Sequence, residues 1–505
     1  MNVLFVYPNV KGQLGFHYGL ASLSAVLKRA GHRTALINLN EGWEPLPTPE
    51  EFRARVRTFD PGLVGFSVVT PQAKIASSMA AEVKRVGPYP VIFGGVHATM
   101  VPEEVAADPS VDYVCVGEGE GALLELVAAL ERGGDPSAIR NLWVRRGGTV
   151  ARNPVRPFAD VASLPMPDHD LFDFQRFTEA KGGWVGLMAS RGCPFRCSYC
   201  FNHGMVDRYR QDLGLKAGEL GYVRRLPVDR ILAEIEHLQK TYAGIRMFIF
   251  DDDLFTHDAD AVVEFARRYP KVSKVPITVN AHVKRFDARV ARALRDAGCR
   301  QVKFGLESGS PRIRREVMNR PMSDDEIASA FACAHEAGLV TSAFVMVGLP
   351  RETPEDLEKT FALLARVRPG RMRWSTFFPF PGTRAFAMAE GDGSLDAGRM
   401  RELDSFFGES CLDLGPEMNL FVRRTRRLLP WEVNARLPGR VGALYGSLVG
   451  TFRAMPDAAF EEAVKDFRLV DAEVAGWAAS AGGDPYRIRF TDFMAVRAGA
   501  AAEDE

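Results

Sequence analysis

The chain has 505 residues, enough for about three domains of ordinary size. Hydrophobic residues make up 46% of it and charged residues 25%, while 64 basic and 64 acidic side chains leave a formal net charge of zero. This composition excludes a mostly disordered chain, and the balanced charge argues against attraction of the whole protein to nucleic acid.

We expect a cytoplasmic protein. No run of 18 apolar residues occurs, so no transmembrane helix is predicted, and the first residues do not resemble a signal peptide. The seven cysteines are too sparse for a disulfide scaffold, which favours reduced thiols.

Residues 1–133 alternate between short apolar runs and helical patterns. This alternation predicts a doubly wound parallel sheet of the Rossmann-like kind. Ligands bind such sheets at the carboxyl ends of the strands, where this chain has glycine-rich turns at 94–95 and 117–121. The predicted strands are 3–7, 34–39, 63–69, 91–93 and 113–116.

Three further regions follow. Residues 134–183 contain a predicted hairpin and a proline-rich stretch, interpreted as a linker. Residues 184–386 alternate again, which predicts a partial (β/α)₆ barrel of the TIM type. Residues 387–505 are predicted to be helical and to help close a substrate cavity. The predicted barrel strands are 185–189, 247–250, 277–280, 302–306, 342–347 and 374–378.

Three cysteines occur within eight residues, as Cys193-x₃-Cys197-x₂-Cys200. Three thiolates on one loop can hold three corners of an iron–sulfur cubane and leave its fourth iron open to another ligand. A structural zinc site with His203 as fourth ligand, and buried thiols without a metal, are the alternatives.

This spacing resembles that of the radical S-adenosylmethionine (SAM) enzymes, and the resemblance covers about 184–386. It implies a [4Fe–4S] cluster on the three cysteines, SAM on the open iron, and reductive cleavage of SAM to a 5′-deoxyadenosyl radical. It also implies an external electron donor similar to flavodoxin or ferredoxin. The SAM-binding residues that it implies are Tyr199, Asp252, Asp253, Asn280, Glu307, Ser308 and Met346.

The N-terminal sheet before such a barrel resembles the cobalamin-binding radical SAM proteins, the class B type of methyltransferase, over about 2–170. Small residues at strand ends would let a corrin and its nucleotide tail approach the backbone. No G-x-G-x-x-G follows the first strand, which argues against a dinucleotide site. The expected cobalamin-binding residues are His17, Tyr18, Gly19, Ser67, Val68, Thr70, Gly94, Gly95, His97, Gly117, Glu118, Gly119 and Glu120.

The sequence departs from many cobalamin enzymes after its first strand. The motif D-x-H-x-x-G, whose histidine binds cobalt from below, is absent, and residues 7–12 read YPNVKG instead. The sequence therefore does not identify the lower ligand of cobalt. His17 is either that ligand or an ordinary polar loop residue.

The resemblance implies C-methylation of an unactivated carbon in a small molecule or natural product, by way of methylcobalamin. The alternatives are oxidative cyclisation or rearrangement without methyl transfer, and a non-catalytic cobalamin or iron–sulfur sensor or scaffold. No catalytic side chain is assigned. Residues 423–427 contain four arginines, which indicate either a solvated helix face or a site for an anionic substrate or membrane surface.

Overall fold

The computed structural model describes residues 1–403 and 408–499. The chain forms two compact units: the first consists mainly of Met1–Asp253 and Pro379–Ala387, and the second of Leu254–Phe378 and most of the C-terminal region. In the described part of the chain, no helix has both the length and the hydropathy needed to span a bilayer.

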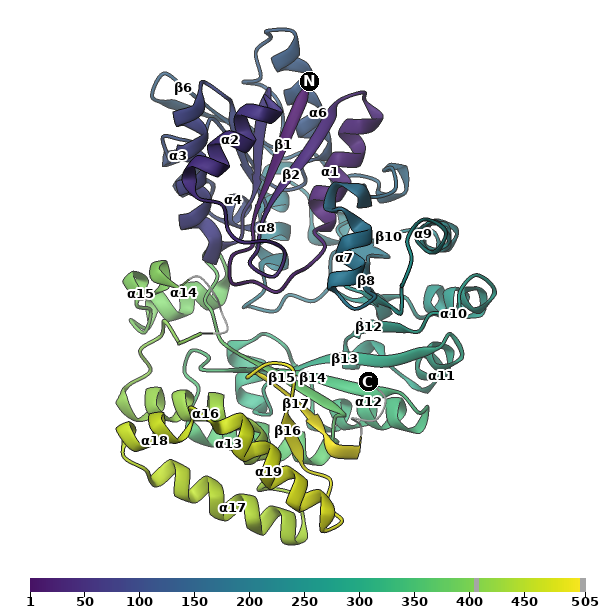
Figure 1. Cartoon of the computed structure of the whole chain (residues 1–505), viewed down its shortest axis with the longest axis vertical. Coiled ribbons are helices and arrows are strands. Elements are labelled where there is room, and N and C mark those ends of the chain that lie inside the picture. Colours follow the sequence, from purple (N-terminus) through teal and green to yellow (C-terminus); the bar gives the residue numbers. More distant parts are fainter. Residues whose placement is uncertain (404–407, 500–505) are drawn as a thin grey trace. The chain divides into compact units, whose positions relative to one another are not determined.

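The first unit contains a seven-stranded sheet in the order β2-β1-β3-β4-β5-β6-β7, and its first five strands are parallel. Helices cover both of its faces, with α1 on one side and α2 and α3 on the other (Figure 1). The doubly wound fold is therefore confirmed. The strands are β1 (Asn2–Pro8), β2 (Arg33–Leu39), β3 (Leu63–Ser67), β4 (Val91–Gly94), β5 (Tyr113–Cys115), β6 (Leu142–Arg146) and β7 (Thr149–Arg152), and the helices are α1 (Tyr18–Arg29), α2 (Pro49–Phe59), α3 (Ala73–Val86), α4 (Val96–Met100), α5 (Pro102–Ala107) and α6 (Glu120–Glu131).

Strand β1 shows why a continuous apolar run forms the centre of this sheet. Val3 and Phe5 belong to one hydrophobic cluster, and Leu4 and Val6 belong to the other. Successive side chains point to opposite faces, so a strand covered on both faces must be apolar at every position.

The predicted hairpin forms, but it extends the N-terminal sheet. Strand β6 pairs antiparallel with β5 and with β7. The expected boundary at residue 133 therefore divides residues that share one sheet, whereas the boundaries at 183 and 386 stay predictions.

The six strands predicted for the barrel are all present. In the first unit β8 (Trp184–Leu187) pairs in parallel with β11 (Met247–Phe250). In the second unit β12 (Ile277–Ala281), β13 (Cys299–Glu307), β14 (Val340–Val347) and β15 (Arg371–Thr376) pair in parallel. The elements around them are β9 (Ser190–Arg191), β10 (Arg224–Arg225), α7 (Phe174–Ala180), α8 (Phe201–Leu213), α9 (Val228–Thr241), α10 (Ala259–Arg268), α11 (Ala288–Asp296), α12 (Asp324–Glu336), α13 (Pro354–Val367) and α14 (Arg384–Gly391).

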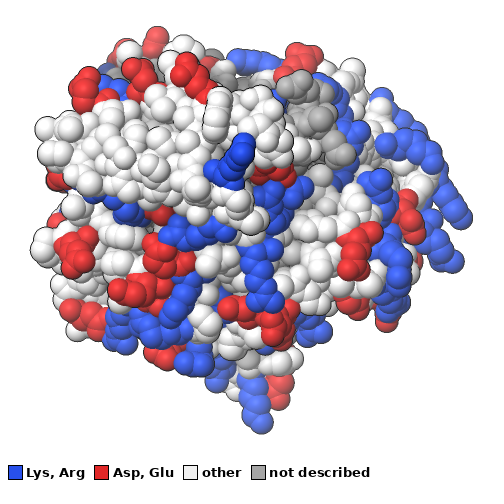
Figure 2. Space-filling view, turned by 90° about the horizontal axis from the view of Figure 1, so that it is seen from below, with Lys and Arg blue, Asp and Glu red and all other residues white. Residues whose placement is uncertain are grey.

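The C-terminal region is helical, with one addition that the sequence did not predict. A hairpin of β16 (Tyr486–Ile488) and β17 (Met494–Arg497) pairs antiparallel with β15. Seen from below, a broad uncharged area adjoins mixed acidic and basic side chains (Figure 2). The helices are α15 (Ala397–Glu402), α16 (Pro416–Asn434), α17 (Gly439–Ala454), α18 (Asp457–Ala463) and α19 (Phe467–Ser480).

Candidate active site

A cavity of about 340 Å³ opens at the carboxyl ends of the parallel strands in the first unit. It extends between the sheet and helices α1 and α6, where its walls are mainly apolar. The expected cobalamin-binding residues that line it are His17, Tyr18, Gly19, Ser67, Gly94, Gly95, Gly117, Glu118, Gly119 and Glu120. Their convergence gives a slot suited to the tail of a large cofactor.

Two glycines fix the turns that line this cavity. Gly95 has φ +91°, and a Cβ atom there would lie 2.8 Å from the backbone nitrogen and oxygen of Val68. Gly117 has φ +83°, and a Cβ there would lie 2.3 Å from the hydroxyl of Tyr209. Only glycine satisfies both the positive φ and the close approach, so the backbone itself forms this part of the wall.

His17 is held by two hydrogen bonds at the mouth of the cavity. The backbone N–H of Leu20 donates to its Nδ1 at 3.1 Å, and its Nε2 lies 2.9 Å from the hydroxyl oxygen of Ser67. Since Nδ1 accepts, the proton belongs on Nε2, which donates to Ser67. Burial lowers the pKa of His17 to about 4. The imidazole is thus neutral, caps α1 and has no free lone pair for cobalt in this arrangement.

Three expected cobalamin-binding residues do not line the cavity. Val68 is fully buried in the hydrophobic core. His97 is also buried, and its Nδ1 lies 3.3 Å from the hydroxyl oxygen of Thr70. Burial lowers the pKa of His97 to about 4. In the structure His97 and Thr70 bond to each other rather than facing the cavity.

Residues from outside the N-terminal sheet, which were not predicted from the sequence, complete the wall of the cavity. Met188 and Arg191 precede the cysteine loop, and Phe201 and Met205 follow it on α8. No local motif marks them. Their one signal is that they flank Cys193–Cys200, so the residues on both sides of the cysteine loop belong to the wall of the first cavity.

A network of charged side chains connects the cavity to the start of the cysteine loop. Glu118 accepts two hydrogen bonds from Arg224, at 2.8 and 2.7 Å, and one from Arg191 at 3.2 Å. Arg191 also donates to Glu120 at 2.7 Å and to Ser22 at 3.1 Å. We call these five residues the Glu118 network.

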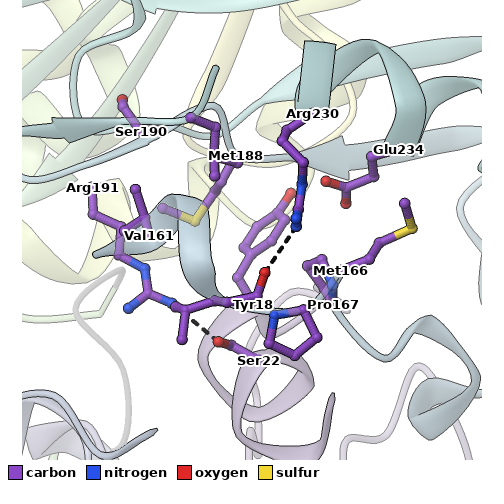
Figure 3. Close-up of a pocket in the computed structure, with 13 residues that line it drawn as sticks. Tyr18, Ser22, Val161, Met166, Pro167, Met188, Ser190, Arg191, Arg230 and Glu234 are labelled. Atoms are coloured by element: carbon purple, nitrogen blue, oxygen red, sulfur yellow. Dashed lines mark hydrogen bonds between the residues drawn. The ribbon is translucent and has the colours of Figure 1, made fainter. Parts of the chain in front are cut away.

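The arginines of this network keep the Glu118 carboxyl group ionised although it is largely buried. Burial alone would raise the pKa of Glu118, but the hydrogen bonds from Arg224 and the charge of Arg191 lower it below its ordinary value. Arg191 points toward Ser22 beside a second, small cavity of about 70 Å³, which Tyr18 and Met188 also line (Figure 3). This second cavity is too small for a cofactor.

The cysteine loop runs from β9 to α8. Gly192 has φ +88°, and a Cβ there would lie 2.5 Å from the backbone oxygen of Tyr222. Cys200 occupies the N-cap position of α8 without a side-chain capping bond, and its N–H donates to the backbone oxygen of Cys197 at 3.1 Å. Burial raises the pKa of Cys200 to about 12, and the other two thiols add to this effect. Such a thiol becomes a thiolate only beside a cation such as iron.

The surroundings of His203 bear on the zinc alternative. Among the described residues no group of three or more His, Cys, Asp or Glu side chains is arranged around a single ion. His203 is buried, with its Nε2 3.2 Å from the oxygen of Ser198 and 3.3 Å from the nitrogen of Arg384. This nitrogen is thus engaged within the protein, whereas a cubane would need only the three thiolates, each bound to an iron of its own.

The two aspartates expected to bind SAM differ in their surroundings. Asp252 is fully buried and accepts hydrogen bonds from the N–H of Ala189, at 3.1 and 3.0 Å, and from the hydroxyl of Ser190. Burial raises its pKa to about 6. It joins β8 to β11 and is saturated. Asp253 accepts from the N–H of Gly192 at the start of the cysteine loop, and burial raises its pKa. Tyr199 lies half-buried within that loop.

The other expected SAM-binding residues belong to the second unit. Asn280, Glu307 and Met346 lie half-buried at the carboxyl ends of β12, β13 and β14. Glu307 has φ +65°, which is strained for a residue with a side chain. Ser308 is fully buried, and its hydroxyl oxygen accepts from the N–H of Ser310 at 3.2 Å. Ser308 thus stabilises the turn that follows β13, and its role toward SAM stays a prediction.

Comparison with known proteins agrees with this geometry. Residues 187–364 match the Radical SAM superfamily, and residues 9–127 match the B12 binding domain. An uncharacterised methyltransferase of Pyrococcus horikoshii is 30% identical over 407 residues, which is 78% of this chain and 84% of that protein. The anaerobic magnesium-protoporphyrin IX monomethyl ester cyclase of Rubrivivax gelatinosus is 26% identical, over 76% of this chain and 69% of its own.

A solved structure shares the fold. The radical SAM methyltransferase TsrM of Kitasatospora setae, with cobalamin and a [4Fe–4S] cluster bound, superposes with a TM-score of 0.62 at 19% identity, over 78% of this chain and 76% of that one. The N-terminal sheet comes first in this chain, and the barrel strands with the cysteine loop follow it. This is the order in which the chain matches the B12 binding domain and the Radical SAM superfamily. The chain therefore belongs to the cobalamin-dependent radical SAM enzymes, the family that includes such methyltransferases.

Proposed function

We propose that this enzyme transfers a methyl group from SAM, by way of cobalamin, to an unactivated carbon of a small molecule. One observation carries the proposal: Arg191 and Phe201, at the two ends of the cysteine loop, line the cavity of the N-terminal sheet. A cofactor in that cavity and a cluster on that loop would be neighbours, as a reaction that uses both requires.

The residues of the first unit fit these groups. Cys193, Cys197 and Cys200 would hold the cluster, and Asp253 would accept a hydrogen bond from the ammonium group of SAM. The glycine turns at 94–95 and 117–119 would receive the cobalamin tail. When bound, these groups supply a radical that removes a hydrogen atom and a cobalt centre that carries the methyl group.

The protein's own part is to position these groups and to exclude water. Met188, Phe201 and Met205, which flank the cysteine loop in sequence, give the cavity an apolar wall that would protect reactive species from solvent. His17 holds its proton on Nε2 toward Ser67, and the Glu118 network fixes the start of the loop. The SAM-binding roles of Asn280, Glu307 and Met346, which belong to the second unit, rest on the resemblance alone.

The test begins with protein purified without oxygen and supplied with iron, sulfide and hydroxocobalamin. Bound iron, sulfide and cobalamin are measured together, and SAM with a deuterated methyl group is then added with reductant. We expect about four irons and one cobalamin per chain, and the label in a methylated product. The electrons would come from a flavodoxin- or ferredoxin-like protein in the cell.

The other functions give different results. Formation of 5′-deoxyadenosine and of a product without label would indicate cyclisation or rearrangement instead of methyl transfer. The cyclase of Rubrivivax gelatinosus is a relative of that kind. Four irons without cobalamin would also overturn the proposal. A sensor or scaffold would cleave no SAM at all.

A further inference from the structure

A third cavity, of about 440 Å³, lies in the second unit along helix α16. Its volume is within the range of small-molecule sites. The described residues that line it are Arg399, Glu409, Ser410, Leu412, Leu414, Pro416, Asn419, Leu420, Val422, Arg423, Arg426 and Asp457. We call it the α16 cavity.

The α16 cavity adjoins the carboxyl ends of two barrel strands. A Cβ atom at Gly348, directly after β14, would lie 3.2 Å from Val422. At the end of β15, the hydroxyl of Thr376 donates to the oxygen of Gly408 at 3.0 Å, and the indole of Trp374 donates to the oxygen of Arg426 at 2.9 Å. This edge of the strands is where barrel enzymes bind substrates.

The structure separates the four arginines of 423–427 into different roles. Arg424 is buried, stacks on Phe460 and bonds to the backbone oxygen of Met455, so its role is structural. Arg427 does not line the cavity and pairs with Asp492 at 3.3 Å. Arg423 and Arg426, three positions apart on one face of the helix, line the cavity.

The described lining brings together three guanidinium groups, on Arg399, Arg423 and Arg426. Arg423 pairs with Asp457 at 2.6 Å and lies 3.9 Å from Glu461, and Arg399 pairs with Glu409. Burial lowers the pKa of Arg426, and the charges of Arg427 and Arg399 lower it further, although Glu409 and Glu461 oppose them. Such a group of guanidiniums suits an anion, because guanidinium groups bind carboxylate and phosphate in a bidentate way.

The rest of the wall is apolar. Leu412, Leu414, Leu420 and Val422 face the same space as the arginines. A small hydrophilic anion would leave this surface without a partner, whereas an anion with a hydrocarbon body would cover it and gain from its burial.

From these observations we infer that the α16 cavity is a substrate subsite for an amphipathic anion, a carboxylate or phosphate group attached to a hydrocarbon body. Calling the occupant a substrate rests on the proposed methyl transfer, but its binding does not. Arg423 and Arg426 bind the anionic group, and the leucines contact the hydrocarbon.

The test uses the cofactor-loaded full chain and isothermal titration calorimetry. The probes are octyl phosphate and octanoate, with octanol and inorganic phosphate as controls for each half of the recognition. We expect one of the two amphiphiles to bind at one site per chain, and the comparison between them distinguishes phosphate from carboxylate. We expect octanol and inorganic phosphate to bind at least about tenfold more weakly.

Two substitutions on the same helix make a matched pair. Arg426→Gln should weaken the amphiphile at least about tenfold, and Arg427→Gln, which removes the same charge outside the cavity, should leave it unchanged. Arg426→Lys keeps the charge and should recover part of the affinity, with melting temperatures checking that each variant folds.

Equal loss in both glutamine variants would overturn the inference, because it would indicate general charge attraction. Binding of octanol as tight as that of the amphiphiles would also overturn it. Failure of all soluble probes, with binding to vesicles of phosphatidylglycerol instead, would assign the arginines to a membrane surface. Amphiphile binding without methyl transfer would leave the subsite standing and refute only the proposed function.

Discussion

The cavity of the N-terminal sheet and the α16 cavity both lie at the carboxyl ends of parallel strands, but they are built differently. Glycine turns at Gly95 and Gly117 contribute backbone to the wall of the first, and its charged residues are bonded to one another in the Glu118 network. Guanidinium groups and leucines on a helix form the second.

The difference suggests that the first cavity takes a ligand common to the whole family, and that the second takes a ligand that differs from one member to another. A wall made by glycine turns accepts few substitutions, because a Cβ atom forces the turn to shift. A cavity made by side chains changes its preference with each substitution and leaves the fold intact. The first suits a cofactor shared by a family, and the second suits the part of a substrate that distinguishes one enzyme from another.

The largest effect is expected at the cysteine loop, where Cys197→Ala should abolish SAM cleavage. The cluster would lose one of three thiolates, so bound iron should fall to near zero. Cobalamin should still bind, because the glycine turns do not change. Iron analysis and the optical spectrum of cobalamin check both statements.

Cys333→Ala, on α12 of the second unit, is the matched control and should keep its iron. Loss of cobalamin together with iron in Cys197→Ala would show that the first cavity depends on the cluster, and the contrast drawn above would fail.

The next largest effect is expected at Gly95. An alanine there would have both a positive φ and a Cβ 2.8 Å from the backbone of Val68, so the turn must shift. Bound cobalamin should fall at least about tenfold, which corresponds to roughly 1.4 kcal/mol or more. Retention of cobalamin during gel filtration, with titration of its optical spectrum, measures the change.

Gly31→Ala provides the control for backbone strain alone. Gly31 has φ +86°, and no atom lies within 4 Å of the position of its missing Cβ. It should lower stability by about 1–2 kcal/mol and leave cobalamin binding unchanged. Equal loss of cobalamin in both variants would mean that strain, not the close approach, is what matters at Gly95.

These two sites also show what a sequence can predict. Glycine turns after apolar strands were predictable, since backbone geometry is a local property. Met188, Arg191, Phe201 and Met205 were not, because they reach the cavity from the barrel through the tertiary fold. The β16–β17 hairpin was missed because strands of three and four residues give no periodic signal.

The arginines of α16 could not be sorted from sequence for a related reason. The partners that occupy Arg423 and Arg427 are Asp457 and Asp492, 34 and 65 residues further along the chain. A solvated face and an anion site were both consistent with the run. Arg423 and Arg426 line the cavity and Arg427 does not, and this division comes from the tertiary fold.

A smaller, selective effect is expected from the Glu118 network. Glu118→Gln removes the charge that Arg191 and Arg224 share, and breaking such a partly buried pair costs about 3 kcal/mol. The start of the cysteine loop should loosen relative to the cavity. We expect more 5′-deoxyadenosine released per methylated product, with iron content preserved.

The control is Glu103→Gln. Glu103 and Arg152 form an exposed pair at 3.6 Å, worth well under about 1 kcal/mol. That variant should release as much 5′-deoxyadenosine per methylated product as the wild type does. If Glu118→Gln also released 5′-deoxyadenosine and product in the wild-type ratio, the network would contribute only to stability.

The smallest effect is expected from His97, an expected cofactor residue that the structure buries against Thr70. Its folded pKa is about 4, whereas an unfolded histidine titrates near about 6.5. Between these values the unfolded chain binds a proton that the folded chain does not, so stability falls as the pH falls from 6.5 to 4, by at most about 3.4 kcal/mol. His97→Asn should flatten the decrease in melting temperature over this window, and the exposed His237→Asn should not. If His97→Asn instead lost cobalamin at pH 7.5 with an unchanged melting profile, His97 would belong to the cofactor site after all, and the first cavity would depend on a side chain as well as on backbone.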